Sequence, residues 1–333
     1  MSSLPDSTSS ASPSKIVDVA IGYMAAKQLF AASEAGVFAA LADGPATAAE
    51  IAERAGIPAN VARILADAMS SLDLLTRTDG VYANTPATAR YLAGSAGDLD
   101  LRKFLAFLDA VSYGHWLGFI NTVRTGKPGD LDMSGDRMDI FMGGVMTYNA
   151  LHAKMLADNF DFSPYTKVLD YGGLSVSFLV EALTANSALN GTFFSGGPLV
   201  EAARGVLAEA GLNERVEIVE GDPLQGDIPT GFDLVFLEHV AHRYDDEQNR
   251  AIVKRAREAA VPGAKLLLLD FFLDNDDKQR SIDALHAGEY LTIDGTIVYP
   301  EDQVHGWLTE AGWTPVETLA LPGSPRVIVA EAR

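Results

Sequence analysis

Apolar residues in the first part of the chain recur at the spacing of amphipathic helices. They fall three or four positions apart over residues 16–42, which predicts a helix with one interruption. The pattern Thr47-Ala-Ala-Glu50 is typical of a capping box, and a second helix is predicted over Val61–Leu75. Thr76–Asn84 then predicts a hairpin that turns at Asp79-Gly80. Helix, turn, helix and hairpin is the order of a winged helix.

A different pattern begins after Pro164, where short apolar runs alternate with amphipathic helices. Strands are predicted at Lys167–Tyr171, Gly191–Ser195, Val216–Val219, Phe232–Leu237 and Ala264–Phe271. Helices are predicted at Ser177–Ala188, Leu199–Gly211 and Asp246–Ala260. Two final strands, Thr314–Ala320 and Val327–Ala332, are expected to form an antiparallel edge pair. This alternation predicts an α/β, Rossmann-like fold with a mainly parallel sheet covered on both faces.

The pattern therefore divides the chain into four segments. We expect a disordered tail over residues 1–14, a winged-helix-like dimerisation domain over 15–100, a helical linker over 101–160 and a Rossmann-like domain over 161–333. The linker is dense in aromatic residues and methionines, which form either a core and dimer interface or the lining of a pocket. The candidate pocket residues in it are Tyr113, Trp116, Met142, Met146 and Asn149.

Composition narrows the choice of partners. The chain of 333 residues has a net charge of −20, which disfavours binding to nucleic acid or to anionic membranes. The second predicted helix carries Arg63 as its one basic residue, so it lacks the pattern of a DNA-recognition helix. The chain has no cysteine, which excludes disulfides and thiolate chemistry and fits a cytoplasmic protein. No apolar run is long enough to predict a membrane span.

In an open parallel sheet, ligands bind beyond the carboxyl ends of the strands, where the strand order reverses. The loop after the first strand contains Asp170, Gly172 and Gly173, and two adjacent glycines let the backbone turn sharply and approach a ligand. Four of the six histidines lack the paired spacing of metal ligands, so no metal site is predicted. They are His115, His152, His286 and His305.

The order of these segments resembles the family of S-adenosylmethionine-dependent O-methyltransferases that act on plant phenolics and bacterial natural products. The resemblance covers about residues 16–333, and its most specific stretch is Leu237-Glu-His-Val-Ala-His-Arg-Tyr-Asp-Asp-Glu247. It implies an N-terminal dimerisation domain, S-adenosylmethionine as the cofactor and a small-molecule acceptor.

The resemblance also assigns roles to individual residues. It implies His242 as the general base, with Asp270 where the family often has a glutamate that orients the histidine. A neutral imidazole suits this role because transfer to oxygen needs a deprotonated nucleophile. The residues that it implies for cofactor binding are Asp170, Gly172, Gly173, Ser195, Asp222, Pro223, Leu224 and Glu238. It places Glu289 near the acceptor.

Several positions depart from the family pattern, and Tyr299-Pro300 stands where the family usually has Arg-Thr before its last helix. Leu174 and Val176 stand where the cofactor loop has its third and fourth glycines, and a β-branched residue is strained at positive φ. Ser195 stands where an acidic residue holds the ribose hydroxyls, and Arg243 stands where the family usually has aspartate.

Three functions are consistent with these observations. The first is methyl transfer to a hydroxyl, or to a thioether, which needs no base. The second is another reaction on the same scaffold, such as hydroxylation, cyclisation, elimination or decarboxylation, motivated by the altered cofactor loop. The third is a non-enzymatic protein that binds a ligand or partner. Methyl transfer is our primary prediction.

Overall fold

The structure, a computed structural model, describes residues 12–94, 99–275, 277 and 279–333. It divides into two compact units. The first contains the described residues up to Val111 together with Asp136–Thr147, and the second contains Ser112–Gly135 and Tyr148–Arg333. The helical segment expected over residues 101–160 is thus shared between the two units. Most of the expected tail, residues 1–14, lies outside the described residues, although Ser14 already belongs to the first helix.

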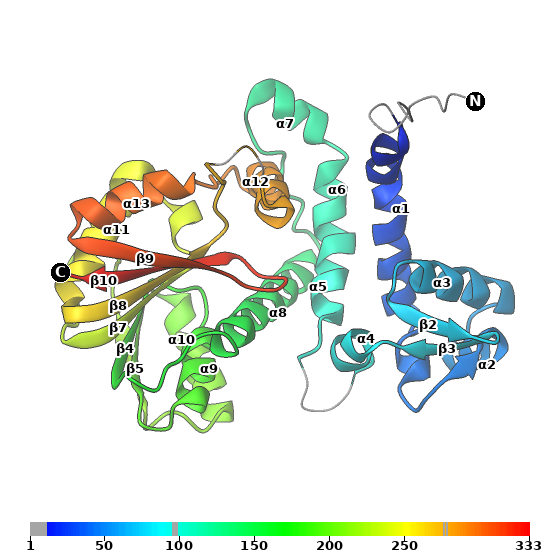
Figure 1. The fold of residues 1–333 in the computed structure, drawn as a ribbon, viewed down its shortest axis with the longest axis horizontal. Coiled ribbons are helices and arrows are strands. Elements are labelled where there is room, and N and C mark those ends of the chain that lie inside the picture. The colour runs from blue at the N-terminus through cyan, green and yellow to red at the C-terminus, as the bar shows by residue number, and fades with distance from the viewer. Residues whose placement is uncertain (1–11, 95–98, 276, 278) are drawn as a thin grey trace, which may run out of the picture. The chain divides into compact units, whose positions relative to one another are not determined.

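The first unit contains a small helical fold with a three-stranded sheet (Figure 1). The Thr47–Glu50 capping box is present, and Asp79 and Gly80 both adopt positive φ at the hairpin turn, as the sequence predicted. The elements of this part are α1 (Ser14–Glu34), η1 (Ala39–Leu41), β1 (Ala46–Thr47), α2 (Ala48–Ala55), α3 (Ala59–Ser71), β2 (Leu75–Thr78), β3 (Val81–Asn84), α4 (Pro86–Tyr91) and α5 (Arg102–Phe107).

Two elements continue from the first unit into the second. They are the π-helical turn η2 (Leu108–Ser112) and the long helix α8 (Arg137–Ala157). Between them, the second unit contributes α6 (Tyr113–Trp116) and α7 (Phe119–Thr125). Among the described residues, no helix is long and apolar enough to cross a membrane.

A seven-stranded sheet forms the centre of the second unit, in the order β6-β5-β4-β7-β8-β10-β9. The first five strands in this order are parallel, and β10 and β9 extend the sheet as an antiparallel pair, as predicted. The strands are β4 (Lys167–Tyr171), β5 (Asn190–Ser195), β6 (Val216–Glu220), β7 (Phe232–Glu238), β8 (Ala260–Asp270), β9 (Trp313–Ala320) and β10 (Arg326–Ala332).

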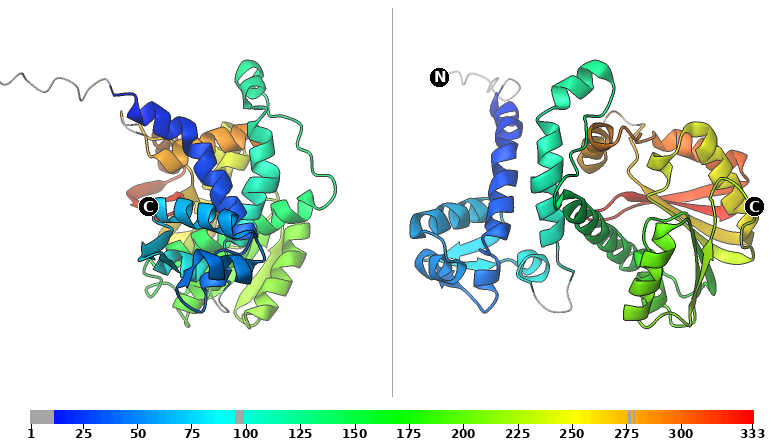
Figure 2. Two further views of the ribbon diagram at one scale, coloured as in Figure 1. Left: turned by 90° about the vertical axis from the view of Figure 1, so that its right-hand side faces the viewer. Right: turned by 180° about the vertical axis from the view of Figure 1, so that it is seen from behind.

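Helices cover both faces of this sheet, and Figure 2 shows them in two further views. Leu169 and Tyr171 of β4 point to the face packed by α11 and α13, whereas Val168 points to the face packed by α8, α9 and α10. This alternation is the period of a strand buried on both sides. The helices are α9 (Ser177–Ala185), α10 (Pro198–Glu209), η3 (Ala241–Arg243), α11 (Asp246–Ala259), α12 (Ser281–Ile293) and α13 (Glu301–Glu310).

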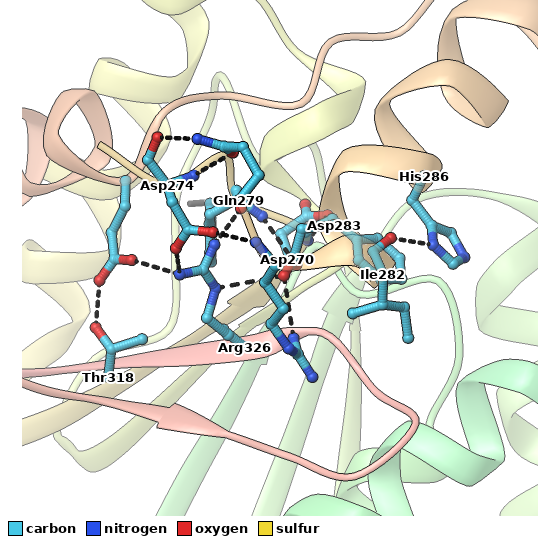
Figure 3. Close-up of polar contacts among 12 residues, drawn as sticks. Asp270, Asp274, Gln279, Ile282, Asp283, His286, Thr318 and Arg326 are labelled. Atoms are coloured by element: carbon cyan, nitrogen blue, oxygen red, sulfur yellow. Dashed lines mark hydrogen bonds and ion pairs between the residues drawn. The ribbon is translucent and has the colours of Figure 1, made fainter. Parts of the chain in front are cut away.

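Helix α12 was not predicted from the sequence, and a buried ionic network attaches its start to the sheet (Figure 3). Arg326 of β10 donates to Asp274, to Glu301 at 3.1 Å and to the carbonyl of Phe272. Its Nε also lies 3.6 Å from Asp283 in the first turn of α12. One buried guanidinium therefore holds together the loop after β8, the start of α12 and the start of α13.

We expect Arg326→Met to lower the free energy of unfolding by about 3–5 kcal/mol, because Asp274 and Glu301 lose their guanidinium partner and Asp283 keeps Arg280 alone, at a site where the arginine side chain is 9% exposed. Urea unfolding measures the effect. Arg204→Met is the matched control, since this arginine is largely exposed beside Glu201 and its loss should cost less than about 0.5 kcal/mol. Similar losses in both variants would contradict the role of the network.

Candidate active site at the carboxyl ends of the parallel strands

The strand order places the site. From β4 the chain proceeds to β5 and β6 on one side and then returns to β7 and β8 on the other. The reversal lies between β4 and β7, and a crevice for ligands is expected at the carboxyl ends of these strands. The loops that follow β4, β7 and β8 there carry Gly172, His242 and Phe271, respectively.

The loop after β4 depends on its two glycines. Gly172 has φ +79°, a conformation that favours glycine, and its N–H donates to the carbonyl of Phe194 at 2.8 Å. The N–H of Gly173 donates to Oδ1 of Asp170 at 3.2 Å. A Cβ on Gly173 would overlap the Asp170 carboxylate. The loop therefore folds back on the strand end and keeps Asp170 against its backbone.

The two missing glycines do not strain this loop, contrary to the concern that their positions raised. Neither Leu174 nor Val176 has positive φ. Val176 has φ −81° and immediately precedes α9. Its side chain is buried in the core beneath the sheet. The sequence departs from the family pattern here, and the backbone adopts a conformation that β-branched residues tolerate.

Two carboxyl groups are buried at these strand ends without a full set of partners among the described residues. Asp170 is inaccessible to solvent and Glu238, the last residue of β7, is 1% exposed. Among the described residues, Oδ2 of Asp170 and both carboxyl oxygens of Glu238 have no hydrogen-bond partner. Burial raises the pKa of Asp170 to about 8, partly offset by the Gly173 N–H and by Arg243. Burial and the neighbouring Asp170 raise the pKa of Glu238 well above its ordinary value. Such a pair suits a cationic ligand.

The other residues predicted at the cofactor lie at the ends of β5 and β6. The hydroxyl of Ser195 is buried and donates to the carbonyl of Gly173 at 3.3 Å. Asp222 is exposed and accepts hydrogen bonds from the N–H of Leu224 at 2.8 Å and from Gln225. These bonds lower the pKa of Asp222. The carbonyl of Pro223 accepts a bond from the Tyr171 hydroxyl at 2.8 Å. Ser195 thus braces the loop after β4, and Asp222 braces its own turn.

His242 and Asp270 form a buried pair. Nδ1 of His242 lies 2.9 Å and 3.0 Å from the two carboxyl oxygens of Asp270, and the backbone N–H of His242 donates to the same carboxylate at 3.1 Å. Burial alone would raise the pKa of Asp270, but His242 and His239 outweigh it and lower this pKa. The carboxylate therefore stays ionised and holds Nδ1 as the protonated nitrogen, which leaves Nε2 free to accept a proton.

A second histidine contact was not expected from the sequence. Nε2 of His239 lies 2.9 Å from Nδ1 of His152 on α8. Donor atoms of His239, His242 and Asp270 lie within 4.8 Å of one another, a spacing that could suit a metal ion. However, Nδ1 of His242 and Nε2 of His239 are already engaged in hydrogen bonds. The geometry is better described as two hydrogen-bonded pairs, His152 with His239 and His242 with Asp270. The signal in the sequence that could have indicated this cluster is the three-residue spacing of His239 and His242.

Two of the predicted acceptor residues of the second unit, Trp116 and Glu289, are in contact. The indole N–H of Trp116 donates to Oε2 of Glu289, and the other carboxyl oxygen of Glu289 is buried without a partner among the described residues. Burial raises the pKa of Glu289. Asn149 is buried on α8, and Tyr113 begins α6. Met142 and Met146 lie on the part of α8 that belongs to the first unit.

The sequence analysis missed several aromatic rings near His242 and Asp270. The ring of Tyr290 stacks on His242 with centroids 4.3 Å apart. His286 stacks on Phe271 at 3.8 Å, and its Nε2 lies 3.3 Å from the hydroxyl of Tyr148. Tyr290 and His286 both lie on α12, so the unpredicted helix supplies much of the aromatic wall. His242 is therefore surrounded by aromatic rings.

Comparisons with known proteins agree with this geometry. The profile of the O-methyltransferase domain matches residues 129–314, and that of the O-methyltransferase dimerisation domain matches residues 17–94. The 3-hydroxy-5-methyl-1-naphthoate 3-O-methyltransferase of Streptomyces sahachiroi is 32% identical over 95% of this chain and 94% of its own length. The tetracenomycin polyketide synthesis 8-O-methyltransferase TcmO of Streptomyces glaucescens is 26% identical over 93% and 94%, respectively.

A solved structure agrees over the whole chain. The apo form of the S-adenosylmethionine-dependent methyltransferase SibL superposes with a TM-score of 0.84 at 28% identity and covers 96% of this chain and 99% of its own. A Rossmann-like sheet with a carboxylate-oriented histidine at its switch point defines the class, an α/β enzyme that binds small molecules at the carboxyl edge. The chain belongs to the family of S-adenosylmethionine-dependent O-methyltransferases, as its sequence resemblance predicted.

Asp170→Asn should stabilise the protein increasingly as the pH rises from 5 to 8. The pKa of Asp170 is about 8 in the folded protein against an ordinary value of 3.8. Folding therefore penalises the ionised form, and the stability of the wild type is lost as the pH rises toward 8. We expect the gain to grow by about 1 kcal/mol or more over this range, measured by urea unfolding.

Asp222→Asn is the matched control for this measurement. The pKa of Asp222 is lowered by hydrogen bonds from Leu224 and Gln225, so its ionised form is favoured by folding. Its replacement should destabilise the protein once the pH exceeds the ordinary pKa of an aspartate. If the two substitutions changed the free energy of unfolding in the same direction as the pH rises, folding would not disfavour the ionised form of Asp170 as proposed.

Proposed function

We propose that the protein transfers the methyl group of S-adenosylmethionine to a hydroxyl of a small aromatic molecule. The observation that carries the proposal is the buried pair of His242 and Asp270 beside the switch point. The relatives described above are methyltransferases, which supports methyl transfer over the alternative of another reaction on this scaffold.

The residues around the β4 loop fit the cofactor. When bound, S-adenosylmethionine supplies an electrophilic methyl group on a cationic sulfur. Asp170 and Glu238 offer buried, unpartnered carboxyl oxygens that complement positive charge. Gly172 and Gly173 keep side chains out of the approach to this backbone. Ser195 braces the loop after β4 and Asp222 braces its own turn. A serine in place of an acidic residue leaves fewer acceptors for ribose hydroxyls.

His242 acts as the general base on the acceptor. Asp270 holds the imidazole in one tautomer and orientation, and its ionised carboxylate stabilises the imidazolium that forms when Nε2 takes the hydroxyl proton. A thioether acceptor would attack through its lone pair without a base. The ordered histidine–carboxylate pair therefore favours a hydroxyl.

Rings around the base favour a planar acceptor. Tyr290, Phe271 and His286 stack with each other or with His242 and present flat faces. The Trp116–Glu289 contact adds a carboxyl oxygen that could hydrogen-bond a polar substituent. Relatives that act on a naphthoate and in polyketide synthesis support an aromatic acceptor. Tyr113 and Asn149 of the second unit remain proposed acceptor contacts.

The N-terminal domain is proposed to form a homodimer. It matches the family's dimerisation domain. Helix α1 exposes a set of large apolar side chains that a lone chain would leave in water. The exposed apolar residues of α1 are Ile16, Val17, Val19, Ile21, Tyr23 and Met24.

His242→Gln should lower kcat for methyl transfer to a hydroxyl by about 10²- to 10⁴-fold, because the acceptor keeps its proton at neutral pH. Asp270→Asn should lower kcat as well, because the amide no longer stabilises the imidazolium. The assay follows transfer of labelled methyl from S-adenosylmethionine to a panel of hydroxynaphthoates and related phenols.

His305→Gln is the matched control, since this histidine lies half-exposed on α13 beside Glu301. It should leave kcat within about twofold of the wild type. Equal turnover by the wild type and His242→Gln would contradict the proposed base, and transfer to none of the phenols would contradict the proposed acceptor class.

Ile16→Glu combined with Val19→Glu should convert the dimer to a monomer, because a dimer interface would have to bury the two new charges. Light scattering coupled to gel filtration should give two chains of 35.4 kDa for the wild type and one for the variant. Val206→Glu, at an exposed apolar position on α10, is the control and should remain dimeric. A monomeric wild type would overturn the dimer proposal.

A further inference from the structure

Arg243 joins the loops that follow β4 and β7 at the carboxyl ends of these strands. Its Nη2 donates to the carbonyl of Gly172 in the β4 loop, and its Nε donates to the carbonyl of His239 at 2.8 Å. His239 has φ +54°, so its carbonyl is directed by a backbone conformation that most residues avoid. The guanidinium is therefore fixed between the two loops that border the switch point.

This cation has no anionic partner within the part of the chain that the structure describes. No carboxylate there lies within 4.0 Å of an Arg243 nitrogen, although Asp170 and Asp270 are near enough to influence its charge. Asp270 is already engaged by His242. A guanidinium has five N–H donors, and two hydrogen bonds to carbonyls leave three of them for a ligand.

Ionisable groups of opposite kinds thus lie at the same strand ends. Among the described residues, Oδ2 of Asp170 and both carboxyl oxygens of Glu238 have no hydrogen-bond partner, and Arg243 forms no ion pair. The raised pKa values of Asp170 and Glu238 show that Arg243 does not compensate their burial. A zwitterionic ligand would satisfy both sets at once, and an amino-acid moiety with one ammonium and one carboxylate is the smallest such ligand.

We propose that Arg243 binds the α-carboxylate of S-adenosylmethionine, while Asp170 and Glu238 face its positive charges. The proposal rests on the proposed function, since it assigns a residue to the cofactor of that reaction. A guanidinium matches a carboxylate with parallel, charge-assisted hydrogen bonds. Arg243 therefore acts as a determinant of cofactor specificity, at a position where the family usually has aspartate.

The competing explanation is that Arg243 only joins two backbone carbonyls. A ligand that lacks the carboxylate separates the two explanations. Binding of S-adenosylmethionine and of decarboxylated S-adenosylmethionine is measured by calorimetric titration, with the wild type and with Arg243→Gln. Binding is read directly, so no acceptor and no turnover are needed.

The wild type should bind S-adenosylmethionine about 10- to 100-fold more tightly than the decarboxylated compound, the factor expected for hydrogen bonds to a charged group. Arg243→Gln should bind the two ligands within about threefold of each other. Arg243→Lys keeps the charge without the fork and should retain part of the preference, which provides a second variant if the glutamine variant does not fold.

Arg255→Gln is the matched control. Arg255 donates to the hydroxyl of Tyr171 at 3.0 Å and to the carbonyls of Pro223 and Gly226, so it joins backbone segments beside the same crevice. Its replacement should change the affinity for both ligands by the same factor.

The outcomes are distinguishable. A wild type that binds both ligands equally, or an Arg243→Gln variant that keeps the full preference for the carboxylate, overturns the role of Arg243 and leaves the proposed function standing. A wild type that binds neither ligand at millimolar concentration overturns the proposed function, and this inference with it.

Discussion

Burial of carboxyl groups at the carboxyl ends of three parallel strands is the constraint on which the site depends. Asp170, Glu238 and Asp270 end or nearly end β4, β7 and β8, and each is at most 1% exposed. Removing a carboxylate from water is costly unless a partner replaces the lost hydration. Asp270 has that partner in His242, whereas among the described residues Asp170 has only the N–H of Gly173 and the carboxyl oxygens of Glu238 have no partner. The first arrangement orients the proposed base, and the second leaves carboxyl oxygens that suit a cationic ligand.

The surrounding structure keeps these groups in place at some expense of stability. The Gly173 N–H and the Arg243 guanidinium offset part of the burial of Asp170, yet its pKa remains about 8. The ionic network around Arg326 anchors α12, which carries Tyr290, His286 and Glu289. Buried carboxyl groups with raised pKa values, held by a well-anchored surrounding structure, are typical of preorganised binding sites.

The altered cofactor loop illustrates how a motif can change while its geometry persists. The family pattern asks for four glycines, but positive φ is required here at Gly172 and not at Leu174 or Val176. Gly173 is required for a different reason, because a side chain would meet the Asp170 carboxylate. The loss of the other two glycines is therefore no argument for another reaction on this scaffold, because the backbone at Leu174 and Val176 does not need glycine.

The sequence by itself determined the elements and the class of fold. Strand β4, the capping box at Thr47 and the turn at Asp79-Gly80 were predicted because each depends on neighbours within a few residues. The pairing of His242 with Asp270 was predicted through the family resemblance.

The sequence could not show that His152 meets His239 across 87 residues, or that Trp116 meets Glu289 across 173. Nor could it reveal α12, whose polar and apolar residues do not separate onto two faces. Only the tertiary structure decided these features, because such contacts depend on how distant segments pack and on backbone angles that no local pattern specifies.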